Sequence, residues 1–335
     1  MNKTKKLIAL ISGGGGCEHG VSVASAENLA KLIDGSRYEI LDVFINERGA
    51  WYIRTPKNDG DCRLTPTFPT RLGEKRGFLS DGKLVEVAAA LPCLHGDFGE
   101  DGTVQGALTI AGIPYVGQDV YASAITQDKI YTKLCAEHLG IPTADFVFCD
   151  GDPVDSARES SERKLGYPVV IKPARLGSSH GVSAVARREE FDAAYLSAAK
   201  RDSRILIEKL IRFDHELECA YFMGRLLPAG RILAHGELYD YESKYEKKTE
   251  TEVCIGRYPE IEKQVTEYSA ALVKLIGIRS LSRIDYFVTA GGEIYFNEIN
   301  AFPGMTDSSL FPRMTEEMGY ARGEFVNLLL DGVTD

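Results

Sequence analysis

The chain has 335 residues, of which 44% are hydrophobic, and a formal net charge of −10. This length allows two or three domains with a substantial core, and the net negative charge argues against nucleic acid or an anionic membrane surface as the main partner. Seven cysteines without a Cys-x-x-Cys pair favour free thiols in a reducing cytoplasm over a disulfide framework. The basic start resembles a signal peptide, but its apolar run at residues 7–11 is too short and leads into glycines instead of a cleavage site. No apolar stretch is long enough to cross a bilayer.

The first third of the chain alternates short apolar runs with helical patterns, which predicts a parallel sheet covered by helices. We expect strands at residues 7–11, 38–45 and 85–94, and helices at residues 19–32 and 104–111. Residues 54–82 are rich in Gly, Pro and charge, so we expect a long loop there with a small hairpin.

A second unit is expected to begin near residue 122 and a third near residue 212, so the predicted domains are residues 1–121, 122–211 and 212–335. In the second unit we expect helices at 126–139 and 188–199 and strands at 166–172 and 203–208. In the third we expect a helix at 261–276, a hairpin with strands at 282–288 and 293–300, and a closing helix.

A glycine run precedes the first helix but does not match a common nucleotide-binding motif. Gly14-x-Gly16 is followed by His19, where the Rossmann fingerprint requires glycine, and no P-loop lysine follows the run. These departures argue against a Rossmann dehydrogenase and a P-loop ATPase. Glu18, at the start of the helix, either complements the helix dipole or binds an ammonium group. Its position alone favours the first of these two roles.

Two further loops follow apolar strands. Residues 94–102 hold His95, two acids and three glycines between a strand and a helix, where open α/β sheets place their ligands. Lys172 ends a strand, and the Gly/Ser loop at residues 177–181 follows it. This loop is either a flexible connection or a phosphate-binding loop in which backbone N–H groups act together with the lysine.

A hairpin near the end of the chain gathers charged residues on one face. With the Gly-Gly pair at 291–292 as a two-residue turn, Asp285 lies opposite Glu298 and Arg283 lies opposite Asn300. Facing carboxylates destabilise a sheet unless a cation offsets them, and hard cations take oxygen ligands. A solvated edge is the alternative, but the apolar residues of both strands favour a buried hairpin that holds a metal.

Short motifs occur in a fixed order over nearly the whole chain. They are Gly16-Cys-Glu-His-Gly-Val-Ser22, His95-Gly-x-x-Gly-Glu-Asp-Gly102, Gln127-Asp-Lys129, Ile171-Lys-Pro173, Gly177-Ser-Ser179, Glu208-Lys209, Tyr239-Asp-Tyr-Glu-Ser-Lys-Tyr245, Arg283-Ile-Asp285, Asn297-Glu-Ile-Asn300 and Pro303-Gly-Met-Thr306. Each is weak alone, but the ordered set resembles the D-alanine–D-alanine ligases of the ATP-grasp superfamily. The resemblance implies an α/β fold with ATP-grasp architecture, α+β in its ATP-binding half, after an N-terminal open parallel sheet domain.

The resemblance also implies a role for each matching residue. The ATP site would comprise Lys129, Lys172, Ser179, Glu208, Lys209, Ile211 and Glu216. Two Mg²⁺ ions, which Mn²⁺ could replace, would be held by Asp285, Glu298 and Asn300. The catalytic groups would be Glu18, Ser178, Tyr245, Arg283 and the backbone of Gly304. The D-alanine substrates would contact His95, Tyr239, Lys244, Ser309 and Leu310, and residues 239–252 would form a loop that closes the site.

The implied reaction needs no protein nucleophile, and the sequence shows no obvious Ser/His/Asp or Cys/His set. ATP would phosphorylate the carboxylate of one D-alanine, and the amine of a second would attack the acylphosphate. The product, D-alanyl-D-alanine, would serve peptidoglycan synthesis in the bacterial cytoplasm, and the resemblance implies a homodimer.

The chain departs from the family pattern at a few positions. Leu176 stands where many relatives have an acid, and Asp307 adds a negative charge near the expected site of the second substrate. A ligase that joins D-alanine to D-serine or D-lactate is therefore an alternative, although the resemblance of Tyr239, Lys244, Tyr245 and Leu310 to the dipeptide-forming enzymes favours D-alanine. A non-catalytic ATP-binding sensor on the same fold is the alternative of another class. The retained lysines, acids and arginine argue against it.

Overall fold

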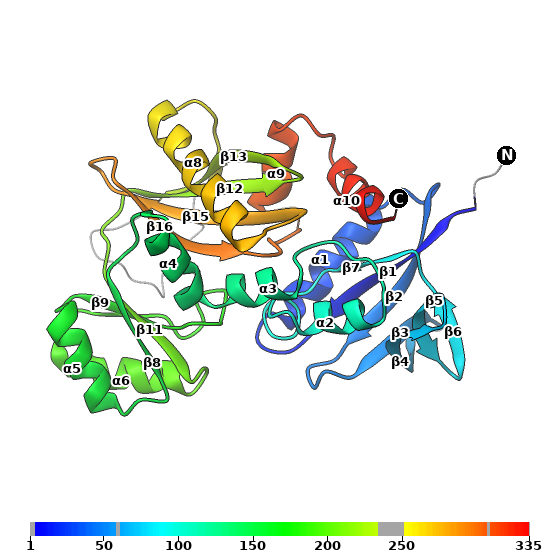
Figure 1. Ribbon diagram of the computed structural model, residues 1–335, viewed down its shortest axis with the longest axis horizontal. Helices are drawn as coiled ribbons and strands as arrows, with labels where there is room; N and C mark the ends of the chain where they lie inside the picture. Colours follow the sequence, from blue (N-terminus) through cyan, green and yellow to red (C-terminus); the bar gives the residue numbers. More distant parts are fainter. Residues whose placement is uncertain (1–3, 58–60, 234–250, 307–308, 335) are drawn as a thin grey trace.

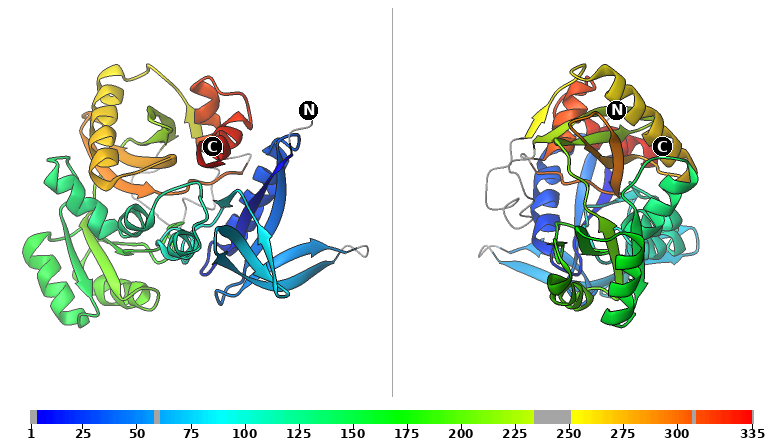
Figure 2. Two further views of the ribbon diagram at one scale, coloured as in Figure 1. Left: turned by 45° about the vertical axis from the view of Figure 1, so that its right-hand side comes forward. Right: turned by 90° about the vertical axis from the view of Figure 1, so that its left-hand side faces the viewer.

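The computed structural model describes residues 4–57, 61–233, 251–306 and 309–334. These residues form three sheets, of seven, four and five strands, each covered by helices (Figure 1). Figure 2 shows the three sheets from two further directions. Within the described residues, no helix is both long and apolar enough to span a membrane.

The first sheet is parallel only at one end. β1 (Lys6–Gly13) pairs in parallel with β2 (Tyr38–Ile45) and β7 (Ala89–Pro92), and α1 (His19–Leu32) and α2 (Thr103–Ile110) follow β1 and β7. This part agrees with the predicted parallel sheet.

The long loop predicted at residues 54–82 was wrong, although the small hairpin expected there is present between residues 67–72 and 75–80. The chain there forms an antiparallel meander of β3 (Trp51–Pro56), β4 (Cys62–Leu72), β5 (Lys75–Ser80) and β6 (Lys83–Glu86), which extends the sheet beyond β2. Side chains in these strands alternate between buried and exposed: Phe78 is fully buried, while its neighbour Leu79 is 38% exposed. The many Gly, Pro and charged residues made this alternation hard to recognise in the sequence. The strand predicted at 85–94 is correspondingly split between β6 and β7.

The single helix predicted at residues 126–139 is two helices. α3 (Val120–Gln127) ends at Asp128, whose backbone is extended, and α4 (Lys129–His138) begins directly after it. The Asp128 side chain accepts a hydrogen bond from the Ile130 backbone N–H, which is an N-cap. The cap turns the chain, so that Lys129 begins a new helix.

The second sheet is antiparallel, in the order β10-β9-β11-β8. Its strands are β8 (Phe146–Asp150), β9 (Val169–Pro173), β10 (Ser183–Val185) and β11 (Arg204–Lys209). α5 (Val154–Lys164) and α6 (Arg188–Ala199) pack against it through a buried cluster that includes Phe191 and Ile207.

The third sheet has the order β14-β13-β12-β15-β16. Its strands are β12 (His215–Phe222), β13 (Arg225–Leu233), β14 (Thr251–Val253), β15 (Leu281–Val288) and β16 (Ile294–Asn300). The helices of this part are α8 (Pro259–Ile276), α9 (Leu310–Glu317) and α10 (Glu324–Thr334). α8 packs against the sheet through Leu272 and Ile276.

The β15–β16 hairpin has the predicted pairing but not the predicted turn. Asp285 pairs with Glu298, and Arg283 with Asn300. Thr289 and Glu293 close a turn of three residues, not two, in which Gly292 has a φ of 82°. A bulge between Asp285 and Tyr286 leaves Asn297 of β16 without a paired residue, and this restores the predicted pairing at the charged end of the hairpin.

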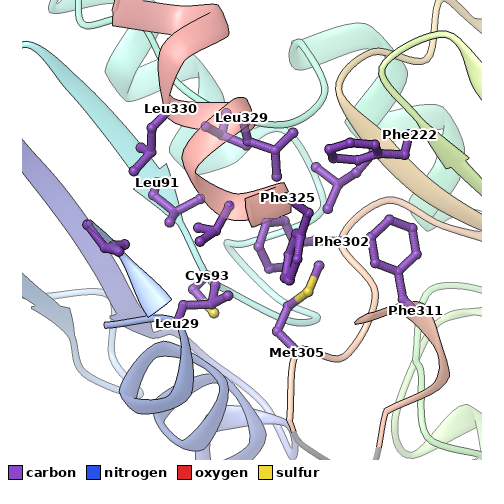
Figure 3. Close-up of a cluster of buried hydrophobic side chains, with 14 of the residues drawn as sticks. Leu29, Leu91, Cys93, Phe222, Phe302, Met305, Phe311, Phe325, Leu329 and Leu330 are labelled. Atoms are coloured by element: carbon purple, nitrogen blue, oxygen red, sulfur yellow. The ribbon is translucent and has the colours of Figure 1, made fainter. Parts of the chain in front are cut away.

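One buried cluster joins the beginning of the chain to its end (Figure 3). Leu29 of α1 and Leu91 of β7 lie in the same cluster as Phe325 and Leu329 of α10 and Phe302, which follows β16. Because α10 packs against both α1 and β7, the last helix covers the first sheet, and the segment after β16 is placed beside it.

Candidate active site

A cleft of about 700 Å³ lies where loops of the three sheets converge. Twelve of the site residues expected from the sequence line it: Glu18, His95, Lys129, Lys172, Ser178, Ser179, Glu216, Arg283, Asp285, Glu298, Asn300 and Gly304. Segments nearly 300 residues apart along the chain thus share one cavity.

Glu18 and Ser178 connect the first and second sheets across the cleft. The Ser178 hydroxyl donates a 2.7 Å hydrogen bond to Glu18 Oε1, as the resemblance implied. Ser178 and Ser179 have φ values of 51° and 53°, a left-handed conformation that is strained for serine. A Cβ at Gly177 would lie 2.8 Å from Glu18 Oε2, so a larger residue there would displace this carboxylate from its present position.

His95 forms a buried wall of the cleft. It is 5% exposed, its ring meets Phe302 edge to face at 5.9 Å, and Nε2 lies 3.4 Å from the Ser25 hydroxyl. Burial lowers the pKa of His95 below its usual value, although the Glu18 carboxylate opposes this effect. The imidazole is therefore neutral at pH 7.

The charged end of the β15–β16 hairpin is held by close polar contacts. Arg283 binds Asp285 through two hydrogen bonds, of 2.8 and 2.7 Å, and Asn300 donates a third to Asp285 at 2.9 Å. Arg283 Nε also lies 3.3 Å from Glu218 Oε1. Burial alone would lower the pKa of Arg283, but Asp285 and Glu218 raise it well above its usual value.

Glu298 faces a lysine from α4. Its carboxylate lies 3.2 Å from Lys129 Nζ. Burial alone would raise the pKa of Glu298, but Lys129 and Lys172 lower it to about 2. Glu298 is therefore ionised at neutral pH and, with Asp285, presents carboxylate oxygens on one wall of the cleft.

Residues 208–211 lie beside the main cleft and not in its wall. Glu208, Lys209 and Ile211 line a separate small pocket together with Phe213 and Phe287, whose rings stack with centroids 4.2 Å apart. Lys209 donates hydrogen bonds to the carbonyl oxygens of residues 165–167. The pocket holds only about 10 Å³, room for about one water, so these residues lie beside the cleft without forming an open slot.

Ser309 and Leu310, expected from the resemblance to contact substrate, are not among the residues that line the cleft. Ser309 is hydrogen-bonded to Thr306, and Leu310 belongs to the same buried cluster as Phe325. Tyr239, Lys244 and Tyr245 lie outside the described residues.

Two acids of the cleft received no role from the sequence. Glu218 follows Glu216 by two residues on β12, and the strand period of two could have placed both on one face.

Glu100 accepts backbone hydrogen bonds from Gly96 at 3.0 Å and from Phe302 at 2.9 Å, and so connects the first sheet to the segment after β16. Burial raises the pKa of Glu100 to about 7. Its partner Phe302 is 202 residues away, and no local pattern signals such a contact.

Comparison with known proteins identifies the family. Residues 7–118 match the family model described as "D-ala D-ala ligase N-terminus", and residues 135–331 match "D-ala D-ala ligase C-terminus". The chain is 34% identical over 347 residues to a D-alanine–D-alanine ligase of Thermoanaerobacter sp. (strain X514), covering 98% of this chain and 96% of that protein. It is also 34% identical over 338 residues to the D-alanine–D-alanine ligase of Lactococcus lactis subsp. lactis, with the same coverage.

Solved structures of two kinds of ligase share the fold. The VanG D-Ala:D-Ser ligase of Enterococcus faecalis superposes with a TM-score of 0.84 at 30% identity, covering 99% of this chain and 100% of that chain. The D-alanyl-alanine synthetase A of Vibrio cholerae gives the same TM-score and identity, covering 99% of each chain. With both halves matched by the family models and the cleft lined by residues of the family motifs, the chain belongs to the D-alanine–D-alanine ligase family, whose members are ATP-dependent.

Proposed function

We infer that the chain performs the reaction for which its family is named, the ATP-dependent joining of two D-alanine molecules into D-alanyl-D-alanine. A carboxylate is a poor electrophile because resonance and charge oppose attack by an amine. Transfer of the γ-phosphoryl group of ATP to the first D-alanine yields D-alanyl phosphate and ADP. The amine of the second D-alanine then displaces phosphate.

The first D-alanine is proposed to bind between Glu18 and His95. The Glu18 carboxylate, held in place by Ser178 at 2.7 Å, is suited to the ammonium group of the substrate. His95 is neutral, so it adds no positive charge that would repel this ammonium. We propose that Tyr245 is the other partner in the hydrogen-bonded link to Glu18.

ATP is proposed to lie between the second and third sheets. Lys129 and Lys172 line the cleft and would neutralise the phosphates, with the loop at Ser179 beside them. The segment that includes Glu208, Lys209 and Ile211 would contact the adenine ring, and Glu216 would bind the ribose. Phe287 supports this placement, because it lines both the main cleft and the small pocket beside Glu208 and Ile211.

The residues of the hairpin fit a divalent cation. Asp285 and Glu298 pair across β15 and β16, and a divalent cation between them would add to the compensation that Arg283 and Lys129 already give. Asp285, Glu298 and Asn300 would hold Mg²⁺, and Mn²⁺ is proposed as a replacement. When bound, the two ions would neutralise the charge of the transferred phosphoryl group.

Arg283 and the Gly304 backbone N–H are proposed to stabilise the oxyanion that forms when the amine attacks. Both residues line the cleft, and Arg283 is in direct contact with Asp285. A guanidinium held by two carboxylates is already oriented before reaction, so little reorganisation is needed. Exclusion of water by residues 239–252 would protect the acylphosphate.

We propose that the second substrate is D-alanine, with Lys244 and Ser309 near its carboxylate as the family motifs imply. The similarity to a D-Ala:D-Ser ligase keeps D-serine as a competing substrate. We further propose that the enzyme acts in the bacterial cytoplasm as a homodimer. Analytical ultracentrifugation measures the oligomeric state directly, and a monomer at micromolar concentration would exclude this dimer.

One assay tests the function. The purified enzyme is incubated with ATP, Mg²⁺ and D-alanine, alone and in competition with D-serine and D-lactate across pH, and the products are identified by mass spectrometry. We expect ADP, phosphate and D-alanyl-D-alanine in equal amounts. The absence of D-alanine-dependent ADP release would exclude a ligase, and a mixed product from D-serine in competition would reassign the second substrate.

A further inference from the structure

Behind the phosphate-facing wall of the cleft lies a buried triad of charges, formed by Lys133 of α4, Glu208 of β11 and Lys172 of β9. The Glu208 carboxylate forms ion pairs with both lysines, one through each oxygen. Lys133 and Glu208 are 1% and 4% exposed. Lys133 also donates a 2.6 Å hydrogen bond to the Thr143 hydroxyl. The triad is therefore shielded from solvent, where charge interactions are strong.

The two lysines of the triad differ in their access to the cleft. Lys172 lines it, and its Nζ lies 3.5 Å from Asn297 Oδ1 in the bulge of β16. Lys133 does not line the cleft. A ligand in the cleft can therefore reach Lys172 directly, whereas Lys133 is in contact with Glu208 behind the wall of the cleft.

The balance of charge depends on Lys133. Two ammonium groups face one carboxylate, so the triad carries a net charge of about +1. Without Lys133, Glu208 and Lys172 would form a neutral pair, and a phosphate would have to compete with Glu208 for Lys172. Burial alone would raise the pKa of Glu208, but Lys133 and Lys172 keep it below its usual value, so the carboxylate stays charged. Burial lowers the pKa of Lys133, and Glu208 opposes that shift.

We propose that Lys133 is a positioning residue for the nucleotide phosphates: as the second counter-ion of Glu208, it leaves Lys172 with charge available to a phosphate. The proposal rests on the assignment of Lys172 to the phosphates under the proposed function. A purely structural role is the competing explanation, because Lys133 also connects α4 to Thr143, whose hydroxyl bonds the Phe296 carbonyl of β16 at 3.1 Å.

Ligands with and without phosphate separate the two explanations. Binding of ADP with Mg²⁺, and of adenosine, is measured by calorimetry or by inhibition for the full chain and for Lys133→Gln and Lys133→Met. We expect ADP to bind at least tenfold more weakly to both variants and adenosine to change by less than threefold. The KM for D-alanine is expected to stay within twofold.

Matched controls exclude trivial causes. Thr143→Val removes the neutral partner of Lys133 without changing charge, and Lys200→Gln removes one exposed lysine of α6's C-terminal end, so the net charge changes equally. Both controls are expected to bind ADP within threefold of the unaltered protein. Should Lys133→Met fail to fold, Lys133→Gln retains a hydrogen-bond donor for Glu208 and carries the test.

Two outcomes would overturn the proposal. One is equal weakening of ADP and adenosine, which would indicate a distorted pocket. The other is unchanged ADP affinity with a lower Tm, which would indicate a structural role alone. Lys172→Met, measured in parallel, separates this inference from the proposed function. If Lys172→Met leaves ADP binding unchanged, the assignment of Lys172 is wrong; if only Lys172→Met weakens ADP binding, the role of Lys133 is wrong.

Discussion

Ser178 offers a test in which a hydrogen bond and backbone strain can be measured separately. Its hydroxyl binds Glu18 at 2.7 Å, while its φ of 51° is strained for any residue except glycine. A hydrogen bond to a charged group contributes about 1.5–3 kcal/mol, and we take the lower end because Ser178 is exposed to the cleft. Loss of about 1.4 kcal/mol corresponds to a tenfold change in rate. Ser178→Ala removes the bond and keeps the strain, whereas Ser178→Gly removes both.

We therefore expect kcat/KM for D-alanine to fall about tenfold in both variants. Glycine relieves the strain of the left-handed conformation, worth about 1–2 kcal/mol. It also adds entropy to the unfolded chain, which offsets part of this gain. Urea unfolding should therefore show that Ser178→Gly is more stable than Ser178→Ala. The assay is steady-state ADP release at saturating ATP and Mg²⁺. The reasoning is refuted if Ser178→Ala keeps kcat/KM within twofold, or if Ser178→Gly alone restores it, since the loop conformation and not the hydroxyl would then matter.

Three further predictions follow from the described contacts. Glu298→Gln should reduce turnover strongly at ordinary Mg²⁺ through lost metal affinity and recover in part at higher Mg²⁺, so near-normal ADP release at low Mg²⁺ would contradict the metal assignment. Because burial raises the pKa of Glu100 from 4.5 to about 7, folding favours its protonated form, and its contribution to stability should be lost as pH rises from about 4.5 to about 7. The urea midpoints at pH 5 and pH 8 should therefore differ less for Glu100→Gln than for the unaltered protein. An equal difference in the two proteins would argue against a raised pKa of Glu100 as the cause. Phe325→Ala in the cluster of Figure 3 should lower the free energy of unfolding by about 3–5 kcal/mol, and a loss below about 1 kcal/mol would show that α10 is not held there by packing.

The hairpin shows how far local reasoning reached. The pairing of Asp285 with Glu298 was confirmed, although the two-residue turn on which it was based was wrong. The true turn is one residue longer, and the bulge at Asn297 compensates for it. The strand period of two allowed the charged faces to be predicted from the sequence. A bulge depends on tertiary contacts of the strand, here the contact of Asn297 with Lys172.

The antiparallel meander shows where local reasoning failed. Composition classified residues 54–82 as a loop, because Gly, Pro and charge are typical of loops. These strands are stable through pairing with β2 and with each other. Strand formation depends more on neighbouring strands than on intrinsic preference, and neighbours cannot be read from one segment.

The sequence by itself determined the order of most helices and strands, the family, and twelve of the residues that line the cleft. These properties depend on short periods and on motifs that each occupy a few consecutive residues. Only the tertiary structure decided how Glu208 is placed between Lys133 and Lys172, how Glu100 links Gly96 to Phe302, and that α10 covers the first sheet. Such contacts join residues with no regular separation, and buried charges find partners only once packing has brought the elements together.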